Sequence, residues 1–163
     1  MKKSWLYGIL ALVILVLCSA LAMYLHVQGQ QQAIKEKGSE LALTRTQMNE
    51  VTFVDTYYGK QDYIVVEGKT ESGEKLVAWF HGDQGEVEKM SRLVPKENVL
   101  KALGKDHPSM QLIHIIPAKQ DNKKVWEVLF TEGDIFHYYY IDMYNGKLMK
   151  AYKLPKKLPE MNT

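Results

Sequence analysis

The chain has 163 residues, 46% of them hydrophobic and 25% charged, a composition typical of a folded protein. It has 21 Lys and Arg against 19 Asp and Glu, so that without Lys2 and Lys3 the charges balance. The sequence has neither a basic stripe nor a glycine-rich phosphate loop, which argues against a nucleic-acid-binding or nucleotide-binding protein.

The first predicted element is a membrane helix. Residues 5–25 include no charged side chain, and as a helix they would be roughly 30 Å long, the thickness of a bilayer core. Lys2 and Lys3 precede this segment. Because basic residues favour the cytoplasmic side, we expect a single-pass cell-membrane protein with a cytoplasmic N-terminus and an extracytoplasmic C-terminal part.

A cleaved signal peptide is the alternative, because Ala20-Leu21-Ala22 has the small-x-small form of a cleavage site. The apolar segment continues past this site to Leu25, so we expect an uncleaved anchor. Leu17 occupies the position before Cys18 where a lipoprotein signal has a small residue, which argues against a lipid anchor. No cysteine follows Cys18, so the rest of the chain has neither a disulfide nor a thiolate nucleophile.

Residues 27–49 have a modest helical pattern of apolar side chains. Gly38 lies within this pattern and predicts an interruption, because glycine weakens a helix interior. We interpret the segment as a helix that leaves the membrane, with residues 39–48 packed on the following strands.

Two similar series of strands follow. Short runs of β-branched and aromatic residues, separated by glycine-containing turns, predict antiparallel meanders. The first series is expected at residues 51–57, 63–69, 75–80 and 86–90, and the second at 110–118, 124–131, 135–142 and 147–152. A short helix at 95–104, with proline at its start and glycine at its end, is expected between them.

The turns at Gly85 and Gly146 lie 61 residues apart, which indicates an internal repeat. The predicted fold class is therefore α+β: an N-terminal transmembrane helix followed by two tandem units, each a helix with a four-stranded antiparallel sheet. The expected divisions are a cytoplasmic stub and anchor at 1–27, a first unit with its leading helix at 28–90, and a second unit at 91–163. Units of about 60 residues are small for independent stability, so we expect the two units to share an interface.

Residues 136–152 contain three consecutive tyrosines followed by Asn145-Gly146. In a strand, Tyr138 and Tyr140 point to one face and Tyr139 to the other. Asn-Gly predicts a tight hairpin in which both residues have positive φ. The row of tyrosines is either a sheet stabilised by cross-strand aromatic pairs or a contact surface for a protein partner.

The sequence offers no arrangement typical of catalysis, and we expect a protein that is not an enzyme and has no cofactor or metal. His81 and Asp83 could begin a metal site, but they lie in a glycine-flanked turn without further ligand spacing. No serine lies in a nucleophile motif. Acidic pairs such as Glu86 and Glu88 have no apolar surroundings that would raise a pKa.

Several short motifs resemble those of the YpmB/TseB-like family of Gram-positive bacteria. They are Val54-Asp55, Tyr57-x-Gly59-Lys60, Tyr63-x-Val65-Val66-x-Gly68, Val77-x-Trp79, Trp126-Glu127-Val128, Tyr140-Ile141-Asp142 and Gly146-Lys147. The last three also resemble the PepSY pattern. The resemblance covers nearly the whole chain and implies tandem PepSY-like (cystatin-like) domains. It further implies a regulator of cell-wall elongation and peptidoglycan synthesis, with a transpeptidase-type penicillin-binding protein as partner and without catalytic residues.

The leading hypothesis is therefore a non-catalytic, membrane-anchored regulator that binds a protein partner and neither nucleic acid nor a small-molecule substrate. The alternative is a PepSY-type inhibitor or modulator of a secreted or membrane protease. Expected partner-binding residues are Tyr138, Tyr139, Tyr140, Tyr57 and Tyr58. Expected structural residues are Trp126, Trp79, Asp142 and Gly146.

Overall fold

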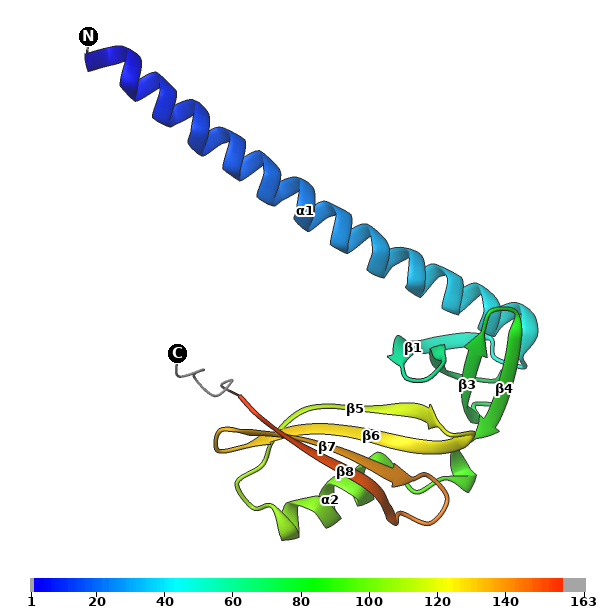
Figure 1. Ribbon diagram of the computed structural model, residues 1–163. Coiled ribbons are helices and arrows are strands. Elements are labelled where there is room, and N and C mark those ends of the chain that lie inside the picture. The colour runs from blue at the N-terminus through cyan, green and yellow to red at the C-terminus, as the bar shows by residue number, and fades with distance from the viewer. Residues whose placement is uncertain (1, 157–163) are drawn as a thin grey trace. The chain divides into compact units, whose positions relative to one another are not determined.

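The computed structural model describes residues 2–156, with the backbone alone for residues 2–6, 8 and 11 (Figure 1). Residues 1–37 form one unit and the chain from Gly38 onward forms a second, compact one. The elements in chain order are α1 (Lys2–Arg45), β1 (Glu50–Tyr58), β2 (Asp62–Lys69), β3 (Lys75–His81), β4 (Gln84–Lys89), the 3₁₀ turn η1 (Met90–Arg92), α2 (Lys96–Asp106), β5 (Gln111–Gln120), β6 (Lys123–Glu132), β7 (Ile135–Asp142) and β8 (Leu148–Pro155).

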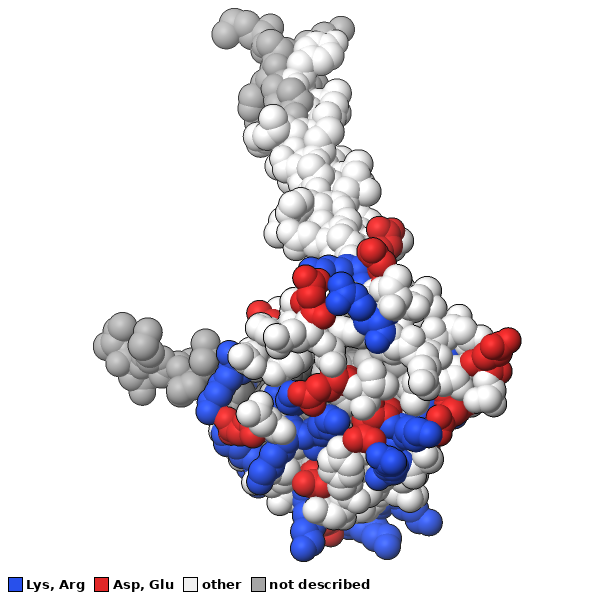
Figure 2. Space-filling view, turned by 90° about the vertical axis from the view of Figure 1, so that its right-hand side faces the viewer, with Lys and Arg blue, Asp and Glu red and all other residues white. Residues whose placement is uncertain are grey.

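Helix α1 is long and apolar enough to cross a membrane once. Its apolar side chains between Tyr7 and Val27 are exposed wherever they are described, and Figure 2 shows this stretch without charged side chains. The helix continues through Gly38, where we expected an interruption. A Cβ atom at Gly38 would lie 2.6 Å from Val54 Cγ1 and 2.9 Å from Ile64 Cγ2. The glycine therefore allows close packing of the helix on β1 and β2.

The first sheet is an antiparallel meander in the order β1-β2-β3-β4. One of its faces packs against the last turns of α1 and the residues just after it. This core contains Leu41, Ala42, Met48, Val66, Leu76, Ala78 and Phe80. Residues 39–48 thus pack on the first sheet, as the helical pattern predicted.

The second sheet repeats this topology in the order β5-β6-β7-β8, and α2 covers one face. Val99 and Leu103 are the buried residues of α2. They belong to a core that includes Trp126, Val128 and the other inward-facing residues of β6 and β7. The indole N–H of Trp126 donates to the carbonyl of Val94 at 2.9 Å, which joins β6 to the segment that leads into α2.

The two sheets share a core. Tyr57, Tyr63, Val65, Val77 and Trp79 of the first sheet lie in the same buried cluster as Ala118, Val125 and Trp126 of the second. The first sheet is therefore covered on both faces, by the end of α1 and by the second sheet. The predicted α+β fold, with one helix and four antiparallel strands in each half, is confirmed.

The turn at Asn145-Gly146 differs from the predicted tight hairpin. Gly146 has a φ of +71°, whereas Asn145 has a negative φ, and the loop extends from residue 143 to 147. The Asp142 carboxylate accepts the backbone N–H groups of Tyr144 at 2.8 Å and Asn145 at 3.1 Å. This aspartate cap stabilises a longer loop. Asp142 and Gly146 thus shape the loop between β7 and β8.

A two-residue hairpin turn occurs instead at Asp121-Asn122, between β5 and β6. These two have φ values of 49° and 62° and are the only described non-glycine residues with positive φ. The combination is typical of a type I′ turn, which matches the twist of the strands it joins.

Candidate partner-binding surface

The row of tyrosines in β7 alternates between a core face and an outer face. His137, Tyr139 and Ile141 are buried beneath α2, whereas Tyr138 and Tyr140 are half-buried on the opposite face. This is the alternation that strand geometry predicts. The structure thus separates the three adjacent tyrosines into one core residue and two surface residues.

The five tyrosines expected at a partner surface differ in how far they are buried. Tyr57 is only 3% exposed and Tyr139 only 9%, so both belong to the core rather than to a contact surface. Tyr57 is buried because the second sheet covers its face of the first sheet, and Tyr139 because α2 covers its face of β7. Tyr58, by contrast, is 72% exposed at the end of β1.

The outer face of the second sheet carries an aromatic surface, which we call the tyrosine face: Phe136, Tyr138, Tyr140, Tyr152 and Leu154. Tyr152 pairs with Tyr138 across β7 and β8 and is 43% exposed. Its ring lies edge-on to that of Tyr140, with 6.0 Å between the ring centroids. Sequence reasoning did not select Tyr152, although its alternation with Lys150 and Leu154 placed it on this face.

The tyrosine face borders a buried carboxylate. Glu127 is almost fully buried, and its Oε1 lies 3.2 Å from His114 Nε2. Burial raises the pKa of Tyr140, and the charge of Glu127 raises it further. Burial, with Glu127 next in effect, also raises the pKa of Tyr57 to about 12. Both phenols therefore stay protonated at neutral pH.

Ion pairs connect the two halves around the shared core. Glu88 Oε2 lies 3.3 Å from Lys124 Nζ and accepts the Tyr144 hydroxyl at 2.8 Å. Glu86 pairs with Lys119. The Lys124 ammonium lies 5.2 Å from the ring centroid of Trp79, which is buried. These contacts fix the two sheets against each other.

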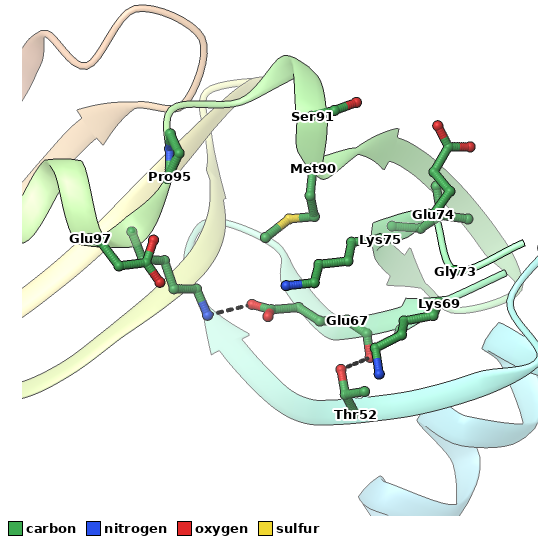
Figure 3. A pocket seen from close by; sticks show the side chains of 13 residues that line it. Thr52, Glu67, Lys69, Gly73, Glu74, Lys75, Met90, Ser91, Pro95 and Glu97 are labelled. Carbon is green, nitrogen blue, oxygen red and sulfur yellow. Dashed lines mark hydrogen bonds and ion pairs between the residues drawn. The ribbon is translucent and has the colours of Figure 1, made fainter.

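A cleft of about 780 Å³ lies between the first sheet and the start of α2 (Figure 3). Its most buried ion pair joins Glu67 Oε1 to Lys96 Nζ at 2.6 Å. The same ammonium lies 5.3 Å from the ring centroids of both Phe53 and Trp126. Thr52, Lys69, Lys75 and Glu97 also line the cleft. The pair of Glu67 and Lys96 joins β2 to the start of α2 at this cleft.

No metal-binding group of three or more His, Cys, Asp or Glu side chains occurs among residues 2–156. His81, considered as a metal ligand with Asp83, has its Nδ1 atom 2.9 Å from the carbonyl oxygen of Asp62.

Comparisons with known proteins agree with this architecture. Residues 37–81 match the family model "Cell wall elongation regulator TseB-like domain", and residues 93–152 match "Peptidase propeptide and YPEB domain", the PepSY family. A curated protein of Bacillus subtilis (strain 168), "Probable cell wall elongation regulator TseB", is 24% identical over 151 residues, which cover 89% of this chain and 91% of that protein. The chain is thus similar to TseB-like proteins over most of its length.

The fold of this TseB-like chain is also that of a solved structure. The YpmB protein from Bacillus subtilis superposes with a TM-score of 0.62 at 22% identity, over 71% of this chain and 94% of that one. The matching family models thus describe TseB-like regulators of cell-wall elongation and PepSY domains, the two resemblances that the sequence motifs indicated.

The TseB-like chain also contains a histidine cluster that sequence reasoning missed. His107, just after α2, has Nδ1 2.8 Å from Glu132 Oε2 and Nε2 3.0 Å from the Tyr139 hydroxyl. His137 is 3% exposed and stacks on Phe130, with 4.7 Å between the ring centroids. The two histidines are 30 positions apart in the sequence, so no local pattern could predict their contact.

The histidine cluster should make the stability of the protein depend on pH. Burial, with His107 and Lys153 nearby, lowers the pKa of His137 below 6.5, and Glu132 opposes this effect only in part. Below about pH 6.5 the unfolded chain therefore binds a proton that the folded chain does not, and the free energy of unfolding falls as the pH falls. The decrease is limited to about 1.4 kcal/mol per pH unit for one proton.

Urea unfolding of wild type and of His137→Phe at pH 7.5 and 5.5 measures this effect. We expect the wild type to lose more stability between the two pH values than the variant does. An equal loss in both proteins would show that His137 is not the titrating group.

Proposed function

We propose that the chain is a non-catalytic, membrane-anchored, extracytoplasmic regulator of cell-wall elongation, and that it binds a transpeptidase-type penicillin-binding protein through the tyrosine face. The observation that carries this proposal is the tyrosine face itself, where Tyr152 and Leu154 are exposed and Tyr138 and Tyr140 are half-buried. Tyrosine is enriched at the centres of protein interfaces. Helix α2 covers the opposite face of the sheet, and the first sheet packs over Ala118 and Val125 and against Tyr140 on this face. The part around Tyr138, Tyr152 and Leu154 is therefore the one available to a partner.

The anchor supports the same proposal. Helix α1 can cross a membrane, and Lys2 and Lys3 before it favour a cytoplasmic N-terminus. The sheets then lie on the outer side, where the transpeptidase domains of penicillin-binding proteins act. Confinement of both proteins to one membrane raises their effective concentration. A small interface therefore suffices for regulation.

The test uses two adjacent tyrosines that differ in burial. Tyr138→Ser removes a ring of the tyrosine face, and we expect a melting temperature within a few degrees of wild type but weaker capture of the penicillin-binding protein. Tyr139→Ser, the matched control, removes a core ring that bonds to His107 and should lower the melting temperature clearly. The measurements are thermal unfolding of the full chain and quantitative capture from detergent-solubilised membranes.

Normal capture by folded Tyr138→Ser and by a Tyr152→Ser companion would exclude the tyrosine face as the contact. If repeated capture experiments with the wild type recover no wall synthase, the proposed partner is wrong.

A protease is the second candidate partner, favoured by the PepSY match over residues 93–152 and its description as a peptidase propeptide domain. In this case the full chain should inhibit a co-purifying membrane or secreted protease in a peptide-cleavage assay. Cleavage rates that do not change across a titration of the chain would exclude this function.

A further inference from the structure

Strand β8 forms a long free edge of the second sheet. It pairs only with β7, and all eight of its residues are exposed. The opposite edge strand, β5, contacts β1, β2 and β3 of the first sheet. Figure 1 shows β8 at the edge with α2 on one side of the sheet. An unpaired edge presents backbone N–H and C=O groups on which another strand can add.

The register shows which backbone groups of β8 point outward. The N–H of Lys156 donates to the carbonyl of Asp134 at 2.9 Å, toward the β7 side. Because hydrogen bonding alternates along an antiparallel pair, Ala151 and Lys153 direct their N–H groups away from β7. Pro155 follows Ala151 and Lys153 in this alternation, so its backbone nitrogen also faces away from β7. A proline, which has no N–H, therefore costs no hydrogen bond to β7 at this position.

An apolar groove lies beside this edge, between α2 and the core face of the sheet. It has a volume of about 340 Å³ and is lined mainly by Val94, Val99, Ala102, Leu103, Ile141 and Leu148. A strand added to β8 would direct every second side chain toward the α2 side of the sheet, where this groove lies. Apolar side chains fit that position.

The charge of β8 is uniformly positive. Lys147 precedes the strand, and Lys150, Lys153 and Lys156 follow without an acidic residue between Leu148 and Lys156. Within the described part of the chain, none of these four lysines has a salt bridge, whereas Lys96, Lys119 and Lys124 are all paired. Lys150 and Lys156 lie on the outer side of the sheet, over the rings of Tyr152 and Phe136.

We propose that the free edge of β8 binds an extended segment of the protein partner as a fifth strand, with acidic residues alternating with apolar ones. The acidic side chains would face Lys150 and Lys156 beside the tyrosine face, and the apolar ones would face the groove along α2. This inference rests on the proposed function, because it specifies how the partner binds. Lysines on an edge strand can also serve only to prevent aggregation, and the experiment distinguishes the two roles.

The probe is the peptide Val-Glu-Val-Asp-Val-Glu-Val-amide with fluorescein on its N-terminus, titrated with the detergent-solubilised full chain in an anisotropy assay. Ala151→Pro removes one outward N–H and places a ring on the edge without removing a bond to β7. Ala151→Val is the matched control, because it adds bulk but keeps the N–H. We expect binding to weaken about tenfold or more in Ala151→Pro, which equals about 1.4 kcal/mol, and to stay within about twofold in Ala151→Val.

Two peptide controls need no change in the protein. A peptide with lysine at the acidic positions should bind much more weakly, and so should a peptide N-methylated at alternate residues, which cannot complete the backbone bonds. Equal binding of the N-methylated peptide, or no binding of the acidic peptide to wild type, would overturn the proposal.

Capture of the wall synthase is measured in parallel with the same variants. If the wild type binds the peptide but captures no synthase, the proposed partner is wrong and the edge site stands. If the wild type captures the synthase and Ala151→Pro captures it equally well, the edge is not the partner's site and the proposed function stands. Loss of both peptide binding and capture in Ala151→Pro supports both proposals.

Discussion

Replacing Trp126 by alanine should lower the free energy of unfolding by about 3–5 kcal/mol, as for other buried tryptophans. The Trp126 ring is fully buried at the centre of the shared core. Its removal leaves a cavity, the Val94 carbonyl without its indole donor and the Lys96 ammonium without one of its two aromatic rings. A loss of this size is a large part of the stability of a small domain.

Urea denaturation of the full chain, followed by far-UV circular dichroism, measures this loss. Trp126→Phe is the matched variant and should lose less, because it keeps an aromatic ring. Tyr58→Ala, at an exposed position, should stay within about 0.5 kcal/mol of wild type. A Trp126→Ala loss below about 1 kcal/mol would contradict a core centred on this residue.

The second large effect is expected at the ion pair between Glu67 and Lys96, whose side chains are 16% and 24% exposed. Glu67→Gln leaves the ammonium between two aromatic rings without its carboxylate, and we expect a loss of about 2–3 kcal/mol. This is less than the value for fully buried pairs, because some water reaches both groups. Lys96→Met with Glu67→Gln should lose less than the two single variants together, since the double variant has no unpaired charge.

The exposed pair of Glu50 and Lys69, 3.2 Å apart, provides the control. Glu50→Gln should change stability by less than about 1 kcal/mol, as is typical of surface pairs. Additive losses in the Glu67 and Lys96 cycle would show that the two side chains do not stabilise the protein as a pair.

The strands could be predicted from the sequence to within a few residues because their signals are local. Alternating β-branched and aromatic residues determine where β2, β3 and β7 lie, and the glycines at 73, 82 and 133 have the positive φ of the turns between strands. The helix α2 was predicted for the same reason, from Pro95 before it and an apolar stripe within it. Local patterns thus determined the order and type of the elements.

The positions that differed from prediction depend on contacts between distant residues. Tyr57 is buried because a sheet that begins 54 positions later covers it, and nothing near Tyr57 in the sequence encodes that contact. Gly38 does not interrupt α1, because its missing side chain is what lets the helix approach Val54 and Ile64. At Asn145-Gly146 a side chain three positions earlier, Asp142, determined the loop.

The candidate surface was predictable only in part. Strand alternation separates Tyr138 and Tyr140 from Tyr139, but it does not say which face α2 covers. The free edge of β8 was not predictable either, because an edge is a property of the whole sheet. The lysines of β8 can be read from the sequence. That they lie along a free edge follows only from the strand order of the sheet.

The strand order has a consequence for how the protein folds. Every strand pairs with its neighbour in the chain, in the orders β1-β2-β3-β4 and β5-β6-β7-β8, so both sheets form from contacts between residues close in sequence. Such topologies fold rapidly, because little loop entropy is lost before pairing begins. The first sheet nevertheless exposes Trp79 and Val77 until β5 and β6 are in place. During synthesis this apolar face of the first sheet can be buried only after β5 and β6 have been made, so the docking of the second sheet is the step that removes it from water.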